Sequence, residues 1–192
     1  MPKLVLQTEA ADRPVRTSEV AEWLCETRAA RLPVISELID SAIATLEKEH
    51  WTQFCAATYD EYFDTWPAEF FQLRKNPAGT VESVKYTDHD GVEQTVSTDV
   101  WEQDDEDGRG IVRLAHNQSW PSDCRGDAND IVVRYTTGYG TPAQVPAPIK
   151  HAIRLWIADA YAFPETVVPL RLSKAPRTVD ALMAGYSFRT IG

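Results

Sequence analysis

Hydrophobic positions recur at helical spacing near both ends of the chain, whereas they alternate with polar positions in the middle. Apolar residues three or four positions apart form one face of an amphipathic helix. This spacing predicts a helix over residues 33–50 and a shorter one that begins at Thr17 or Ser18, either of which is suited to cap it. A third helix is expected over residues 146–163, because proline favours the first turn of a helix and stops a helix from continuing.

Between residues 54 and 137 the period changes to two, which is typical of strands with one buried face. Strands are expected around residues 59–63, 71–73, 81–86, 92–96, 111–114 and 131–135. Asp90 and Gly91 lie between two of them and have the residue types that a hairpin turn with positive φ requires. Helices, then antiparallel strands, then helices predict an α+β fold.

We expect the chain to form one domain over residues 1–192. Its parts are an extended arm at 1–16, helices at 17–50, the β region at 54–137, a helix at 146–163 and an extended tail at 170–192, which also holds a short helical turn. A hydrophobic content of 43% is ample for a packed core.

The net charge of −10 disfavours a general nucleic-acid binder and an anionic-lipid binder, because both need a surplus of cations. No segment is long and apolar enough for a membrane span, and the N-terminus has no signal-peptide core. The three cysteines are odd in number and far apart, so we expect buried free thiols and a reducing compartment.

Charge is distributed unevenly along the chain. Residues 82–107 hold ten acidic side chains against Lys85 alone, whereas residues 170–192 hold four basic side chains against Asp180. This polarity is consistent with two different binding surfaces. Acidic loops that only keep the protein soluble are the alternative.

No motif for catalysis or cofactor binding stands in a suitable context. The sequence from Gly138 to Ala143 fits G-x-G-x-x-A, but the strands before it are expected to be antiparallel, so the crevice of a dinucleotide site is absent. The acidic run 103–108 lacks the EF-hand ligand pattern, and the histidines lack zinc spacing. We therefore expect no enzyme, metal or cofactor. The alternative is a divalent-metal-dependent hydrolase that uses the acidic run at 104–107.

Seven segments, read in order, carry a resemblance to a known family. They are residues 14–20 (PVRTSEV), 63–67 (FDTWP), 81–91 (VESVKYTDHDG), 119–121 (SWP), 131–140 (IVVRYTTGYG), 145–153 (VPAPIKHAI) and 179–182 (VDAL). In this order they resemble the head–tail connector proteins of tailed phages, also called head completion or adaptor proteins.

The resemblance implies a structural protein of the virion neck, made in the host cytoplasm, with no catalytic residues. Its partners would be copies of itself in a ring of roughly twelve, the portal protein above the ring, and a stopper or tail-completion protein below it. DNA would pass through the channel without specific binding, and an acidic lumen would repel its phosphates. The alternative is a tail-terminator-like adaptor that does not touch the portal.

Three sets of residues are candidates for these surfaces. The expected portal contacts are the basic and aromatic residues of the tail, Arg171, Lys174, Arg177, Tyr186, Phe188 and Arg189. The expected ring contacts are Glu37, Asp40, Glu47, Lys48 and Trp101. The expected channel-facing acids are Asp104, Asp105, Glu106 and Asp107. A tail without a partner is the alternative for the first set.

Overall fold

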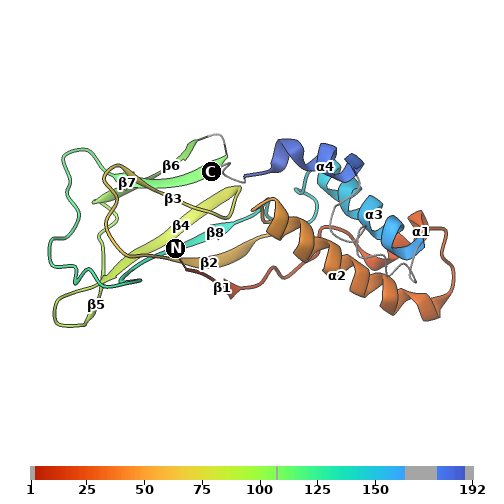
Figure 1. Cartoon of the computed structure of the whole chain (residues 1–192), viewed down its shortest axis with the longest axis horizontal. Helices are drawn as coiled ribbons and strands as arrows, with labels where there is room; N and C mark the ends of the chain where they lie inside the picture. Colours follow the sequence, from red (N-terminus) through yellow and green to blue (C-terminus); the bar gives the residue numbers. More distant parts are fainter. Residues whose placement is uncertain (1–2, 107, 163–176, 189–192) are drawn as a thin grey trace. The chain divides into compact units, whose positions relative to one another are not determined.

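The computed structural model describes residues 3–106, 108–162 and 177–188 and shows an α+β fold, as the sequence predicts (Figure 1). Its contacts divide the chain into two compact units. Unit 1 comprises Met1–Ala11 and Ala56–Gly138, and unit 2 comprises Asp12–Cys55 and Tyr139–Gly192. In the described part of the chain, no helix combines the length and apolarity needed to cross a membrane.

Unit 2 is helical, and its elements follow the predicted apolar pattern. They are α1 (Thr17–Trp23), η1 (Ala29–Arg31), α2 (Leu32–Glu49), α3 (Ala147–Ala162), α4 (Arg177–Met183) and η2 (Ala184–Tyr186). Helix α3 packs against α2 and α4, and α1 packs against α2. Ile39 and Leu46 of α2 and Ile153 and Ile157 of α3 have no exposed surface, because they lie on the apolar faces that the sequence pattern marks.

The predicted cap of the first helix was wrong. Thr17 is already inside α1, and Arg16 occupies the N-cap position in an extended conformation without a side-chain hydrogen bond to the helix. The helix therefore begins one residue earlier than a Thr17 cap would allow and two residues earlier than a Ser18 cap would allow.

Unit 1 is built from two antiparallel sheets (Figure 1). The five-stranded sheet has the order β1 (Leu4–Thr8), β2 (Ala57–Phe63), β8 (Ile131–Thr137), β4 (Ala78–Thr87) and β5 (Glu93–Thr95). The three-stranded sheet has the order β3 (Phe70–Gln72), β7 (Arg109–Leu114) and β6 (Trp101–Glu106).

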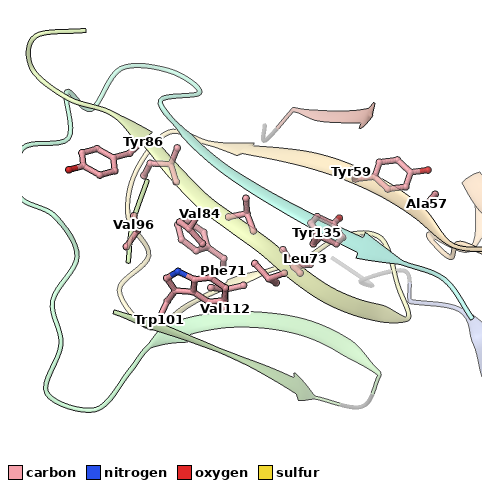
Figure 2. Close-up of a cluster of buried hydrophobic side chains, with 13 residues drawn as sticks. Ala57, Tyr59, Phe71, Leu73, Val84, Tyr86, Val96, Trp101, Val112 and Tyr135 are labelled. Carbon is pink, nitrogen blue, oxygen red and sulfur yellow. The ribbon is translucent and has the colours of Figure 1, made fainter. Parts of the chain in front are cut away.

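The core of unit 1 contains side chains from both sheets. Figure 2 shows Val84 of β4, Phe71 of β3, Val112 of β7 and Trp101 of β6 close together, and all four are buried. Along β2 and β8, alternate residues face this core, as period two requires. Their neighbours face the other way: Arg134 donates two hydrogen bonds of 2.7 Å to Asp60 across these strands.

Two elements differ from the sequence prediction. The first residues, expected as an extended arm, include strand β1, which pairs with β2. The acidic run, expected as a solvated loop, forms strand β6 up to Glu106 and pairs with β7 over six residues. Only Trp101 of β6 is buried, so the strand lacks the alternating apolar pattern by which strands are recognised.

Candidate interaction surfaces

The two units differ sharply in charge. Unit 1 holds 18 acidic and 8 basic residues, so it carries the whole net charge of −10, whereas unit 2 holds 11 of each. Among the described residues, no three His, Cys, Asp or Glu side chains gather closely enough to hold a metal ion. The described acidic side chains of unit 1 are therefore dispersed and are not gathered into a cation site.

The expected channel-facing acids lie on the hairpin formed by β6 and β7. Asp104, Asp105 and Glu106 are exposed, and Asp107 lies outside the described residues. Arg113 of β7 pairs with Glu102 at 2.7 Å and with Asp104 at 3.0 Å, so it offsets part of their charge. Asp105 accepts a hydrogen bond of 2.7 Å from the backbone N–H of Gly108 at the turn.

Trp101 was expected at the ring interface, but its place in the fold argues against that role. It is 9% exposed and packs inside unit 1 with residues of both sheets (Figure 2). A large indole at the start of an acidic strand is buried because it is the one residue of β6 that can cover the core. We therefore keep it out of the proposed ring contacts.

The polar face of α2 holds the other expected ring contacts, and these differ in their exposure and in their contacts within the same copy. Glu37 and Lys48 are exposed. Asp40 is exposed but accepts a hydrogen bond of 2.7 Å from Arg13, whose guanidinium also donates to Ser36 at 2.8 Å. Glu47 is half-buried and accepts a hydrogen bond of 2.8 Å from the backbone N–H of Phe54, so it serves the fold of unit 2.

The described part of the tail is anchored on unit 2. Tyr186 is half-buried, and its ring meets that of Tyr139 edge-on at 6.4 Å. The backbone N–H of Phe188 donates a hydrogen bond of 2.9 Å to the carbonyl of His50. Arg177 is the first residue of α4. Arg171, Lys174 and Arg189 lie outside the described residues.

One surface feature of unit 1, the outer edge of β1, was not predicted from the sequence. The outer edge of β1 carries Leu6, which is 42% exposed, and β5, at the opposite edge of the sheet, follows Val92, which is 54% exposed. The only signal for β1 in the sequence was the short apolar run 4–6, which is too brief to tell a strand from a loop.

Solved structures of gene transfer agent (GTA) particles contain chains with the same fold. A chain from the neck of an empty GTA particle, computed with C6 symmetry, matches with a TM-score of 0.78 and 19% identity, over 99% of this chain and 98% of that one. A chain from the virion of the native particle matches with a TM-score of 0.78 and 20% identity, over 98% and 97%. A chain from the neck of the native particle, computed with C12 symmetry, matches with a TM-score of 0.73 and 20% identity, over 98% of each chain.

No family model matches the sequence, and no curated protein matches it. The structural matches span almost the full length of both chains, so both units and their order are shared. This chain therefore has the α+β fold of chains found in the neck and virion structures of gene transfer agent particles.

Proposed function

We propose that this protein is a structural component of the neck of a phage-like particle, a head–tail connector whose copies form a ring beneath the portal. The observation that carries the proposal is the fold match to chains of a GTA neck over 98–99% of both chains. The sequence resemblance to head–tail connectors supports the same class independently, since it rests on segments that extend from Pro14 to Tyr186.

Ring formation is supported by the rotational symmetry with which the similar necks were computed, C6 and C12. A closed ring joins copies head to tail, so each copy presents two different surfaces to its neighbours. On this proposal the protein has a structural role, and its partners are the portal protein, further copies of itself and a stopper or tail-completion protein.

The negative charge of unit 1 supports a position beside a channel through which DNA slides. A unit with 18 acidic and 8 basic residues repels the phosphate backbone, because favourable contacts would need cations that release counterions from the DNA. We therefore assign the β6–β7 hairpin to the channel side of the ring. The basic residues at 171–189 are assigned to the portal side.

Native mass spectrometry over a series of protein concentrations, with negative-stain imaging of any large species, tests ring formation. A pull-down with the cognate portal protein then tests the position in the neck. The expected result is a closed ring, formed by the protein alone or on the portal, and retention by the portal. Ring formation without portal retention would favour the tail-terminator-like alternative, and a monomer that neither assembles nor binds the portal would contradict the proposal.

A further inference from the structure

The five-stranded sheet of unit 1 ends in two edge strands, β1 and β5, and the three-stranded sheet ends in β3 and β6 (Figure 1). Natural proteins protect sheet edges from pairing with other chains by keeping them short or by placing charges on them. β3 and β5 have three residues each, and β6 carries exposed acidic side chains. β1 has five residues, Leu-Val-Leu-Gln-Thr, without a charge, and its register shift lies after Leu6, so Leu4 to Leu6 form the least protected of the described edges.

The hydrogen-bond pattern shows which groups of β1 are directed outward. The backbone N–H of Tyr62 in β2 donates to the carbonyl of Lys3 at 2.8 Å, which makes Lys3 and Tyr62 a hydrogen-bonded pair. In an antiparallel ladder such pairs alternate, so Val5 is directed to β2, whereas the N–H and C=O groups of Leu4 and Leu6 are directed away from the sheet.

The same reasoning applies to the opposite edge. The backbone N–H of Val96 donates to Val84 at 2.8 Å, and that of Asp88 donates to Val92 at 3.0 Å. Between these hydrogen-bonded pairs, the backbone N–H and C=O groups of Glu93 and Thr95 in β5 are directed away from the sheet. Both edges thus present outward backbone groups two residues apart, which is the spacing that strand pairing requires.

The side chains at the two edges also fit each other. Lys3 lies just before β1, and the exposed Asp90 lies just before β5, so these two charges are opposite, whereas Glu93 of β5 is already paired with Lys85 at 2.7 Å. Leu6 and Val92 are among the most exposed large hydrophobic side chains of unit 1. Pairing β1 with β1 of a second copy would be two-fold and would end at a dimer, whereas pairing two different edges continues around a ring.

We propose that β1 of one copy pairs with β5 of the next copy, so that the five-stranded sheets join into one continuous sheet around the ring. The inference rests on the proposed ring function and names the contact that builds the ring. Successive strands of the sheet run antiparallel, so β1 and β5 run in the same direction. In a ring whose axis runs along the strands, β1 of one copy therefore pairs with β5 of the next copy in the parallel sense. Once the ring closes, neither edge of the five-stranded sheet stays unpaired.

Proline at position 6 tests the pairing, because it removes an outward N–H that no neighbouring strand in the same copy uses. We expect Leu6→Pro to stay folded, with an unchanged far-UV circular dichroism spectrum. It should raise the concentration for half-assembly at least about tenfold, since each interface loses a hydrogen bond. Leu6→Thr keeps the N–H and is the matched control, which should still assemble.

Disulfide trapping gives a second readout that does not depend on the proline variant. Val5 pairs with Asp60 and Thr95 pairs with Lys85, so Val5, Glu93 and Thr95 share the sheet face opposite the core. Cys25 is exposed and Cys124 is half-buried, although buried thiols were expected, so both are replaced by serine in the background. In that background, Val5→Cys combined with Glu93→Cys or Thr95→Cys should give a ladder of cross-linked oligomers on oxidation. Val5→Cys with Val132→Cys, which lies on the central strand β8, is the control and should give none.

The outcomes separate this inference from the proposed function. Wild-type rings, loss of rings in Leu6→Pro and a ladder from either edge pair would support both. Wild-type rings with neither edge pair cross-linked would overturn the pairing and leave the connector function intact. Wild-type protein that forms no ring, alone or with the portal, would overturn the connector function and the pairing together.

Discussion

The hydroxyl of Tyr135 donates a hydrogen bond of 3.0 Å to Oε2 of Glu61, a carboxylate without exposed surface in unit 1. Two further donors reach the same carboxylate from Arg74: Nε at 2.6 Å and the backbone N–H at 3.1 Å. The backbone N–H of Lys75 in turn donates to the Tyr135 hydroxyl at 3.3 Å. The network links strands β2 and β8 to the segment between β3 and β4, and it satisfies a group that would otherwise be costly to bury.

The first prediction is that Arg74→Leu destabilises unit 1. It removes the cation and leaves the Glu61 carboxylate buried with fewer donors, so the free energy of unfolding should fall by about 3 kcal/mol, the low end for a broken buried pair. The low end applies because the Arg74 side chain is 23% exposed. Urea denaturation measures the change. Glu61→Gln combined with Arg74→Leu is the control, and the double variant should be more stable than Arg74→Leu alone.

The second prediction concerns the pH dependence of stability. Burial raises the pKa of Glu61 above its usual 4.5, against the opposing effect of the Arg74 contacts. The folded state therefore holds this proton more tightly than the unfolded state. The resulting stabilisation is fully present below about 4.5 and is lost as the pH rises through the pKa of the folded state. The free energy of unfolding of wild type minus that of Glu61→Gln should increase as the pH falls toward 4.5. Parallel pH curves for the two proteins would contradict the assignment.

The third prediction concerns Gln103, which joins the two sheets of unit 1. Its Oε1 accepts a hydrogen bond of 2.8 Å from the backbone N–H of Val81, and its Nε2 donates to the carbonyl of Gly79. These groups lie where β4 shifts register against β8, so the side chain replaces a backbone partner that the shift removes. Gln103→Ala should lower the free energy of unfolding by about 2 kcal/mol, since two hydrogen bonds are lost. Glu106→Ala on the same strand is the control and should change it by less than about 0.5 kcal/mol.

The sequence predicted the helices of unit 2 and most strands of unit 1 because their buried faces have a clear period. Residues such as Ile35, Ile39 and Leu46 mark such a face without reference to the rest of the fold. Strand β6 was missed because its partners, not its own residues, make it a strand: β7 supplies the hydrogen bonds and Arg113 neutralises two acids. Tertiary context of this kind is not visible in a local pattern.

The candidate surfaces were predicted less well than the fold. Charge polarity indicated the acidic β region, and the structure shows Asp104, Asp105 and Glu106 exposed there. Sequence alone could not separate exposed from anchored residues, so Trp101 and Glu47 were grouped with Glu37 although both serve their own unit. Edge position depends on strand order, which is why the β1 edge was also missed.

The fourth prediction separates the stability of the tail from its proposed portal contact. Tyr186→Ala removes the ring contact with Tyr139, so it should lower the free energy of unfolding by about 1–2 kcal/mol. A triple variant, Arg171→Ala with Lys174→Ala and Arg189→Ala, removes three basic side chains from the proposed contact. It should reduce retention by the portal while its thermal midpoint stays that of wild type. Undiminished retention of the triple variant would remove these residues from the portal surface.

The last prediction concerns the acidic surface of unit 1 and DNA. A variant with Glu102→Gln, Asp104→Asn and Glu106→Gln removes three negative charges from β6 and frees Arg113 from its two partners. Duplex DNA should therefore bind the assembled variant more tightly than wild type in low salt, and the difference should shrink as salt rises, because counterion release drives such binding. Electrophoretic mobility shifts at several salt concentrations measure it.

A second variant tests whether DNA binding depends on the position of the removed charges or on the net charge alone. Glu22→Gln, Glu49→Gln and Asp159→Asn change the net charge by the same amount on exposed positions of unit 2. If the β6 surface faces the channel, only the β6 variant should retain DNA inside the ring, since local potential decays within a Debye length of about 10 Å. Equal DNA binding by both variants would mean that net charge alone sets the repulsion, and the assignment of the hairpin to the channel side would be wrong.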